Sequence, residues 1–288
     1  MRRDTGYPHA DAQEDFVRMR RRAALSRLVQ WLRREPDDVN MVLPFDEVVT
    51  ALGRDSEHPL GLQVIRLDSI VGSVDRTRDF DRWFRPRSGR VRERWERLAL
   101  AQRRGESIPP IDVYRVGELH FVVDGHHRVS VAHALGLATI DAYVTEVRTR
   151  LTAQGIRHRG DLILKKDRRL FLERVPLPDD ARRSISLTDP WEYTELGETV
   201  EAWGFRLMQH EGRFLDRHDV ARRWYTEEYQ PVVRMIRDAD LVDGRTETEA
   251  YLHVSCDRYR LMRTHRWDDD VIAALTSAAN PRRARPTP

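Results

Sequence analysis

A change of hydrophobic period at residue 124 constrains this chain more than any other feature of its sequence. Before Asp124, apolar and polar residues alternate, and Gly117-Glu118 stands where a hairpin must reverse. The alternating apolar residues are Val113, Leu119, Phe121 and Val123. Beyond Asp124 the apolar residues recur with a period of about 3.6, which is the period of a helix. Residues 111–147 are therefore predicted to form a strand, a hairpin, a second strand, a sharp turn, a short helix and a third strand.

The turn before the predicted helix has the properties of an anion site. His126, His127 and Arg128 follow Gly125 and occupy the first turn of that helix. Backbone N–H groups are unpaired at a helix N-terminus, and the helix dipole favours negative charge there. The planar guanidinium of Arg128 suits a phosphate group. The sequence thus predicts a phosphate site at Gly125–Arg128, with Ser130 one turn further along.

The composition excludes several classes of protein without selecting one. Of the 288 residues, 50 are basic and 47 acidic, for a net charge of +3, which permits nucleic-acid binding without requiring it. No apolar run could span a membrane, and the N-terminus lacks the apolar stretch of a secretory signal. The single cysteine, Cys256, excludes an internal disulfide and a cysteine-based zinc cluster. We expect a cytoplasmic protein with no membrane partner.

The predicted class is α+β, with an α/β core flanked by helices. Five segments are expected: a disordered N-terminus (1–13), an N-terminal helical segment (14–58), the α/β domain (60–148), a C-terminal all-helical domain (149–280) and a disordered basic tail (281–288).

Within the C-terminal domain, cap residues predict where helices begin. Either Asp189 or Thr188 caps one helix, and a capping box at Thr246–Glu249 opens another. Asp268 opens a further one, and 216–238 forms a helix kinked at Pro231. The pattern at 162–175 leaves a hairpin and a broken helix equally open.

Residues 14–35 show the pattern of a basic amphipathic helix. Its apolar side, expected to pack on the rest of the protein, is formed by Phe16, Leu25, Leu28, Val29 and Leu32. The other face is rich in arginine. One interpretation is that Arg20, Arg21 and Arg22 contact a DNA backbone. The plainer interpretation is a solvated arginine face.

A short strand at 63–67 is predicted to lead into a polar loop at 71–81. The loop gathers Asp75, Arg76, Arg78, Asp79 and Asp81. It would leave the same sheet that carries the Gly125 turn. Its charged residues are therefore either solvated connectors or part of a ligand site.

The central stretch resembles the ParB N-terminal domain of the ParB/sulfiredoxin superfamily. Four motifs carry the likeness: the helix start Gly125-His126-His127-Arg128-Val129-Ser130-Val131-Ala132, the opening strand Ile65–Ile70, the early arginine Arg76 or Arg78, and the strand Pro109–Val113, which lines the nucleotide in that family. The resemblance covers about residues 60–148 and implies the α/β fold of that superfamily.

The resemblance also implies a nucleotide ligand. ParB proteins bind and hydrolyse CTP and load onto DNA, sulfiredoxins use ATP to reduce a sulfinic acid, and a ParB-like kinase phosphorylates free serine. Sulfiredoxins need a cysteine where this chain has His126, which excludes that activity. ParB proteins typically carry Gly-Glu-Arg-Arg where this chain has Gly-His-His-Arg, and they follow the domain with a helix-turn-helix. The residues after Val147 show no convincing pattern of that kind.

The expectation from sequence and resemblance together is a ParB-like protein that binds CTP or ATP/ADP with Mg²⁺, for hydrolysis or phosphoryl transfer. The assigned residues are Asp75, His126 and His127 for proton transfer, Arg76, Arg78, Gly125, His126, His127, Arg128 and Ser130 for phosphate binding, and Asp124 for Mg²⁺.

Plainer alternatives stay open for two of these residues. Asp124 can serve simply as a turn residue, and Arg128 can simply pair with Asp124. The competing function is a non-enzymatic, DNA-associated regulator that uses nucleotide as a switch. A homodimer is compatible with either function.

Overall fold

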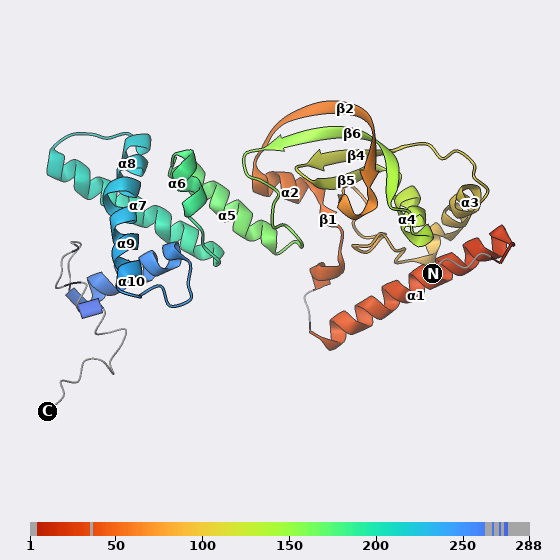
Figure 1. The fold of residues 1–288 in the computed structure, drawn as a ribbon, viewed down its shortest axis with the longest axis horizontal. Coiled ribbons are helices and arrows are strands. Elements are labelled where there is room, and N and C mark those ends of the chain that lie inside the picture. The colour runs from red at the N-terminus through yellow and green to blue at the C-terminus, as the bar shows by residue number, and fades with distance from the viewer. Residues whose placement is uncertain (1–4, 35–36, 263–266, 268–270, 272–273, 276–288) are drawn as a thin grey trace. The chain divides into compact units, whose positions relative to one another are not determined.

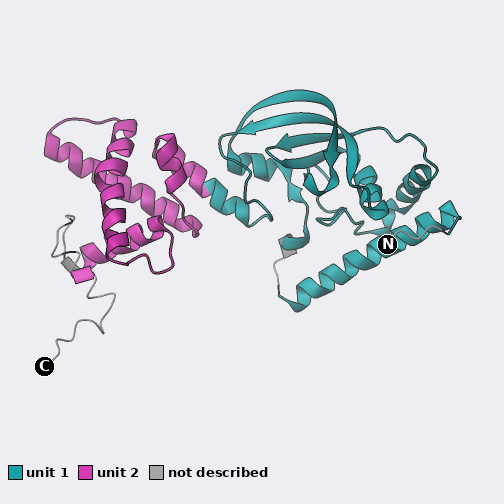
Figure 2. Ribbon diagram, viewed as in Figure 1, with its two compact units in different colours: residues 1–166 teal, residues 167–288 magenta. Residues whose placement is uncertain are grey.

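The chain divides into a sheet-containing unit and a helical unit. The computed structural model describes residues 5–34, 37–262, 267, 271 and 274–275. The two units are residues 1–166 and 167–288 (Figure 2). The division falls within α5 (Asp161–Arg174), beyond the domain boundary expected at residue 148.

A six-stranded mixed sheet is the centre of the first unit (Figure 1). Its strands are β1 (Leu43–Pro44), β2 (Arg54–Arg66), β3 (Ile70–Ser73), β4 (Ile111–Val116), β5 (Leu119–Asp124) and β6 (Thr139–Thr149). The strand order is β1-β3-β5-β4-β6-β2. The neighbours β1/β3, β3/β5 and β4/β6 are parallel, whereas β4/β5 and β2/β6 are antiparallel.

Helices precede, interrupt and follow the sheet. They are α1 (Pro8–Leu32), α2 (Phe45–Leu52), α3 (Arg92–Arg103), α4 (His126–Leu135), α5, α6 (Asp179–Ser184), α7 (Pro190–Glu211), α8 (Arg217–Arg223), α9 (Gln230–Asp238) and α10 (Glu247–Met262). In the described part of the chain, no helix combines the length and apolar character needed to cross a membrane. The α+β class expected from the sequence is confirmed.

The order of elements predicted for residues 111–147 is also confirmed. β4 and β5 form an antiparallel hairpin that turns at Gly117, whose φ is 59°. α4 follows and ends at Gly136, which takes the left-handed conformation expected of a helix-terminating glycine. β6 then returns alongside β4 in parallel.

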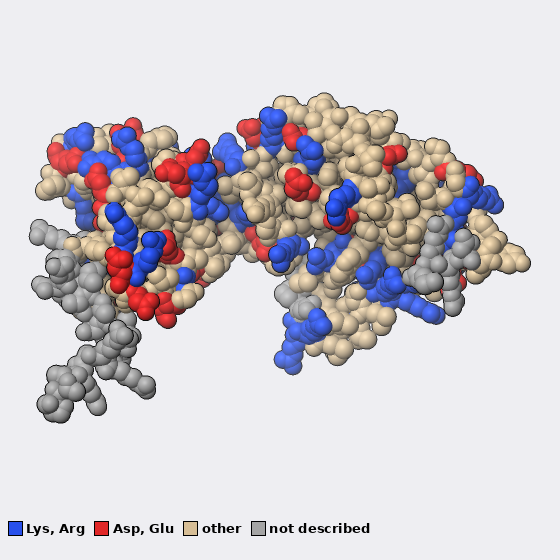
Figure 3. Space-filling model, viewed as in Figure 1, with Lys and Arg blue, Asp and Glu red and all other residues tan. Residues whose placement is uncertain are grey.

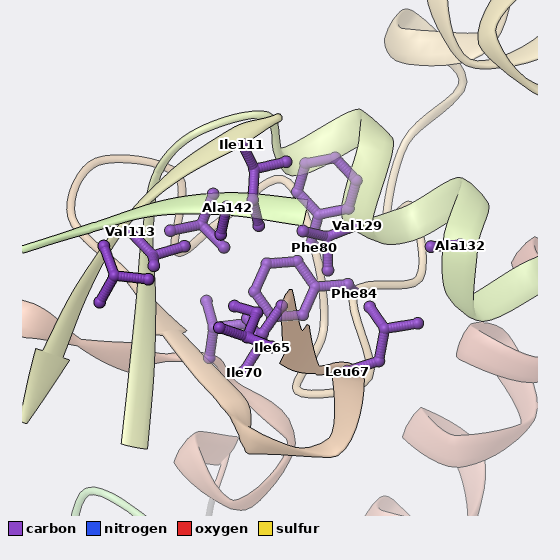
Figure 4. Packing of buried hydrophobic residues seen from close by; sticks show 13 residues of the cluster. Ile65, Leu67, Ile70, Phe80, Phe84, Ile111, Val113, Val129, Ala132 and Ala142 are labelled. Carbon is purple, nitrogen blue, oxygen red and sulfur yellow. The ribbon is translucent and has the colours of Figure 1, made fainter. Parts of the chain in front are cut away.

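The apolar core that supports the Gly125 turn lies between the sheet and α4. Ile111 on β4 and Val129 on α4 are completely buried there, beside Phe80 and Phe84 (Figure 4). Each such burial stabilises the fold by roughly 1.5–3 kcal/mol. Phe80 lies in the polar loop predicted at 71–81 and Phe84 follows it, so this segment after β3 is anchored in the core by two aromatic rings.

Two strands differ from the prediction. β2 begins at Arg54, whereas a strand was predicted only at 63–67, and β3 occupies the start of the expected loop. Most of β2 is exposed, with only Ile65 buried, so its residues show no alternating pattern. β2 forms because β6 pairs with it over its whole length, and the sequence does not show that long-range pairing.

The N-terminal helix starts earlier than predicted. Residues 8–13 were expected to be disordered, but α1 begins at Pro8, which suits the first helical turn because its missing N–H would be unpaired there. The carboxylate of Asp11 accepts hydrogen bonds from Thr5 N (3.1 Å) and Thr5 Oγ1 (2.7 Å). Arg103 of α3, 3 % exposed, forms ion pairs with Asp11 and Asp15 and holds α1 against α3.

The face of α1 expected to be buried is largely exposed. Phe16 is buried against Trp95, as predicted. The other members of the predicted apolar side are exposed: Leu25, Leu28, Val29 and Leu32. The helix packs instead through another set of buried side chains, which includes Ala12, Met19 and Ala23.

Among its described residues, all the regular secondary structure of the second unit is helical, as predicted. Residues 162–175, which the sequence left open, lie almost wholly in α5. Asp189 caps α7, and Thr246 and Glu249 exchange the two hydrogen bonds of a capping box at the start of α10. The helix predicted at 216–238 is interrupted by a π-helical turn (Trp224–Tyr229) just before Pro231. The helix expected to open at Asp268 and the tail at 281–288 lie outside the described residues.

Candidate functional site

Gly125 forms the turn that brings β5 into α4. Its φ of 100° lies in the region that favours glycine. A Cβ at this position would lie 2.4 Å from Cγ2 of Ile111, so steric contact excludes any side chain as well. α4 therefore begins at His126 with no side chain bonded over its first N–H groups. These groups and the helix dipole leave positive potential at the turn.

A pocket of about 330 Å³ opens at this turn. It is lined by Arg76, Arg94, Arg97, Leu98, Pro109, Asp124, Gly125, His126, His127 and Arg128. Four of these side chains are arginines and one is acidic. The volume is at the small end of the range for ligand pockets. The predicted Gly125–Arg128 turn and Arg76 thus come together, although the loop that carries Arg76 is some fifty residues away in sequence.

Two of the pocket arginines, Arg94 and Arg97, were not anticipated. They lie three residues apart on α3, beside the buried Trp95. Trp95 Nε1–H donates to Ser130 Oγ (2.8 Å) and fixes α3 against α4. Neither arginine makes a side-chain hydrogen bond or ion pair with a described residue. No pattern in the sequence shows which face of this helix meets residue 125.

Arg128 borders the pocket but is largely held by the protein. Its Nη1 donates to the carbonyls of Pro109 (2.8 Å) and Pro110, and its Nη2 donates to the carboxylate of Asp124. The ion pair with Asp124 considered from the sequence is therefore present. Arg128 ties the first turn of α4 to the segment before β4, and most of its N–H groups are used in doing so.

His126 is oriented from the end of β3. Its Nε2 lies 2.7 Å from Ser73 Oγ, and both side chains are buried. Ser73 Oγ also accepts the backbone N–H of Arg76 (3.0 Å), so its own hydrogen is available to donate to Nε2. The imidazole proton then resides on Nδ1. The ring also stacks on Phe80, with centroids 6.2 Å apart.

His127 packs its ring edge-on against Phe80, and its buried Nδ1 has no hydrogen-bond partner among the described residues. Burial lowers the pKa of His126 to about 4, helped by the nearby Arg76. Burial and the charges of Arg94 and Arg76 also lower the pKa of His127 to about 4. Both rings are therefore neutral near pH 7. They suit hydrogen bonding to a phosphate better than the neutral-pH acid–base role expected from the sequence.

Three predicted site residues lie elsewhere. Ser130 is fully buried and bonded to Trp95, because α4 turns it toward α3. Arg78 lines a different cleft, between α1 and the segment after β3. Asp75 is exposed and does not line the pocket, although its charge acts weakly on His126. Asp79 pairs with Arg76 at 3.6 Å.

Asp124 is the only acidic residue that lines the pocket in the described part of the chain. One of its oxygens accepts from Arg128, and its side chain is 63 % exposed. The described residues contain no group of three or more His, Cys, Asp or Glu side chains placed to hold a metal ion. Any Mg²⁺ here would take one protein carboxylate and draw its other ligands from phosphate and water, which is a usual arrangement for this ion.

Arg20, Arg21 and Arg22 do not present one DNA-binding face. Consecutive helical residues point about 100° apart, so the three side chains leave α1 in different directions. Arg20 Nη1 lies 3.5 Å from where a Cβ of Gly89 would be, and the charge of Arg22 acts on Arg85. Arg21 is exposed on the side of α1 that carries the exposed leucines.

Comparison with known proteins confirms the resemblance expected from the sequence. Residues 77–156 match the ParB N-terminal domain. Among solved structures, the chain is similar to the crystal structure of sulfiredoxin from Arabidopsis thaliana, with 23% identity, a TM-score of 0.24, and coverage of 30% of this chain and 86% of that one. No curated protein matches the chain.

Proposed function

We propose that the pocket at Gly125 binds the phosphate groups of a nucleotide, CTP or ATP/ADP. The observation that supports this is a convergence of positive charge. Arg76, Arg94, Arg97 and the open N-terminus of α4 meet in one pocket of about 330 Å³. Like charges held this close repel one another, and a polyanion would relieve that repulsion. The volume suits a phosphate chain, with the nucleoside extending beyond the pocket.

The chemistry proposed for this pocket is hydrolysis or phosphoryl transfer. Arg94 and Arg97 would stabilise charge that develops on the phosphoryl oxygens. His126, with its proton on Nδ1, would act as a neutral hydrogen-bond donor. Asp124 would help hold Mg²⁺, which when bound neutralises part of the phosphate charge.

A second proposed function is DNA association with nucleotide as a switch. It is favoured by the exposed arginines along α1, which lie outside the matched domain. In that case the Gly125 pocket would bind nucleotide without consuming it. Measuring whether bound nucleotide is consumed distinguishes the two functions, because only the first one consumes it.

A thermal-shift panel with CTP, ATP, ADP and GTP, each with Mg²⁺, tests the phosphate site. A ligand that binds only the folded protein adds about 2.7 kcal/mol of stability at a hundredfold excess over Kd. The shift should be largely lost in the double variant Arg94→Gln/Arg97→Gln. The matched control is Arg104→Gln at the end of the same helix, where the side chain faces Glu106 instead of the pocket. An equal shift in both variants, or no shift with any nucleotide, would overturn the proposal.

A further inference from the structure

A second and larger cleft lies between α1 and the segment after β3. Its volume is about 850 Å³. It is lined by Ala23, Ser26, Arg27, Gln30, Trp31, Arg34, Asn40, Met41, Arg78, Asp81, Arg87 and Ser88. Basic side chains gather along the hollow between α1 and the sheet domain above it (Figure 3). The Gly125 pocket shares no lining residue with this cleft, so its ligand does not account for the charge here.

The arginines of this cleft are only partly neutralised by the protein. Arg27, Arg34, Arg78 and Arg87 make no side-chain hydrogen bond or ion pair with a described residue. By contrast, the buried Arg103 of α3 is paired with two aspartates. The four cleft arginines share the lining with a single acidic residue, Asp81, and this excess of positive charge favours an anionic ligand.

The spacing of the α1 arginines fits an extended polyanion. Arg20 and Arg27 are seven residues apart in α1, so they lie on one side of the helix about 10 Å apart. Arg34 follows just beyond the end of α1 and also lines the cleft, so the row of arginines is longer than a single phosphate would need. Arg20 reaches toward Gly89, next to the cleft residue Ser88, and so continues the same row.

An aromatic surface stands within this row of charges. Trp31 lines the cleft, between Arg27 and Arg34 in sequence, and is 73% exposed. An indole left open beside unpaired arginines offers a stacking surface for an unpaired base. In a duplex the base faces are covered by their neighbours, so only a single strand can use it.

The cleft also holds one buried hydrogen-bond acceptor. Asp81 is 5% exposed, and its Oδ1 accepts the N–H groups of Trp83 (3.0 Å) and Arg85 (2.9 Å). Among the described residues, its Oδ2 has no hydrogen-bond partner, and Arg85 Nη1 lies 3.9 Å away. A carboxylate can accept from the exocyclic amino group of cytosine, as carboxylates do in base recognition.

The cleft is preorganised by backbone contacts. Arg82 N donates to Asn40 O, and Arg87 N donates to Asp79 O. Arg85 donates to Ser26 Oγ (2.9 Å) on α1 and lies over the ring of Trp83. The Arg85–Ser26 bond fixes the segment after β3 to α1, and the two backbone bonds hold that segment in shape and against Asn40, so a ligand would meet an already formed surface.

We infer that this cleft binds single-stranded nucleic acid, with a base stacked on Trp31, an amino-bearing base read by Asp81, and the backbone phosphates along Arg20, Arg27 and Arg34. Acidic peptides would share the arginines but would gain little from an open indole and a buried carboxylate. Binding in this cleft requires no nucleotide in the Gly125 pocket. The inference is therefore independent of the function proposed for that pocket.

The test is fluorescence anisotropy of the full-length protein with labelled oligonucleotides of about 12 residues, a length within the site sizes of such proteins. Single-stranded DNA and RNA and the corresponding duplex are compared at about 50 and 200 mM salt. Single strands should bind more tightly than the duplex. Trp31→Ala should weaken binding at least about fivefold, the loss expected for one stacked base. The control is Trp191→Ala, an exposed tryptophan of the helical unit.

Charge variants supply the second measurement. Arg27→Gln/Arg34→Gln should reduce the slope of log K against log salt by about 1.4, since each single-strand phosphate contact contributes about 0.7. Arg21→Gln/Arg22→Gln removes the same charge from exposed positions of α1 outside the cleft lining and should change the slope less. Equal effects of the two pairs would overturn the inference, as would duplex binding as tight as single-strand binding.

The third measurement is the preference for one base over another. Oligo(dC) should bind more tightly than oligo(dT), which lacks an amino group. Asp81→Asn retains Oδ1 for the backbone bonds but replaces Oδ2 with a donor, and should reduce or reverse that preference. If an acidic peptide or polyphosphate binds as tightly as the oligonucleotide and Trp31→Ala weakens none of them, the cleft is a general anion surface and the inference fails.

Discussion

Ser73 Oγ lies 2.7 Å from Nε2 of His126, which joins the last residue of β3 to the first residue of α4. The same oxygen accepts the N–H of Arg76 at 3.0 Å. One buried hydroxyl therefore orients the imidazole at the N-terminus of α4 and begins the segment that carries Arg76 to the pocket. Two elements some fifty residues apart are aligned at the proposed phosphate site by this single group.

Replacing Ser73 with alanine should affect both stability and binding. It leaves His126 Nε2 and the Arg76 N–H without their partner, which costs about 1–3 kcal/mol of unfolding free energy. Nucleotide affinity should fall as well, because His126 and Arg76 both line the pocket. Chemical denaturation and a nucleotide titration measure the two effects.

Ser130→Ala is the matched control for that variant. It also removes a fully buried hydroxyl, but one bonded to Trp95 outside the pocket. It should lower stability by a similar amount but reduce nucleotide affinity less than Ser73→Ala does, because no residue that lines the pocket loses its own hydrogen bond. Equal losses of affinity in both variants would show that Ser73 acts only through overall stability.

Gly125→Ala should be among the most damaging single changes in the sheet domain. The new Cβ would combine an unfavourable φ of 100° with a 2.4 Å approach to Ile111. We expect a loss of more than about 3 kcal/mol in unfolding free energy, or failure to fold. Gly136→Ala tests the backbone cost alone, because its φ is 70° and no atom lies within 4 Å of the added Cβ. Its loss should stay near 1–2 kcal/mol, and equal losses at both positions would contradict this account.

Local patterns predicted local structure well in this chain. The change of period at Asp124 and the glycines at 117, 125 and 136 were sufficient for the order of elements from β4 to β6. The cap at Asp189 and the capping box at Thr246–Glu249 likewise lie where helices begin. In each case the interacting groups are only a few residues apart, so the sequence contains the whole interaction.

Features that depend on distant contacts were missed. β2 exists because β6 pairs with it, and its exposed residues show no alternation. The burial of α1 through Ala12 and Ala23 instead of its leucines reflects the surface of α3 and the partners of Arg103. For the same reason the sequence pointed to Gly125–Arg128 but not to Arg94 and Arg97, whose position depends on how α3 packs against α4.

Arg128 is predicted to act mainly through geometry. Lysine would keep the positive charge but could not bond Pro109, Pro110 and Asp124 with one planar group. Arg128→Lys should therefore lower the unfolding free energy by about 1–3 kcal/mol, since carbonyls near the turn lose their donor. Arg97→Lys should have little effect on stability, because Arg97 bonds to no described residue. Urea denaturation of the two variants compares them, and a stable Arg128→Lys protein would show that only the charge matters.

His120 should make the sheet domain sensitive to mild acid. Its side chain is 8% exposed on β5, and burial, aided by the charge of Arg115, lowers its pKa to about 4 from the usual 6.5. Ser69 Oγ donates to Arg66 O and so accepts from His120 Nδ1 at 2.9 Å, while the buried Nε2 has no partner among the described residues. Protonation of Nε2 would place a charge inside the sheet domain without a compensating acid.

The direction of this change in stability depends on whether the native or the unfolded state binds the proton at the higher pH. Below pH 6.5 the unfolded chain protonates this histidine while the native chain does not, so the unfolding free energy falls between about pH 6.5 and 4, by up to about 3 kcal/mol for this group. Above that window His120 contributes no pH dependence. His120→Asn retains a donor for Ser69 but cannot titrate, so its stability should fall less than that of the wild type as the pH decreases from 6.5 to 4. His58→Asn, at an exposed position on β2, is the matched control and should follow the wild type. If the unfolding free energies of His120→Asn and the wild type fall in parallel as the pH decreases, His120 is protonated in the native state without loss of stability.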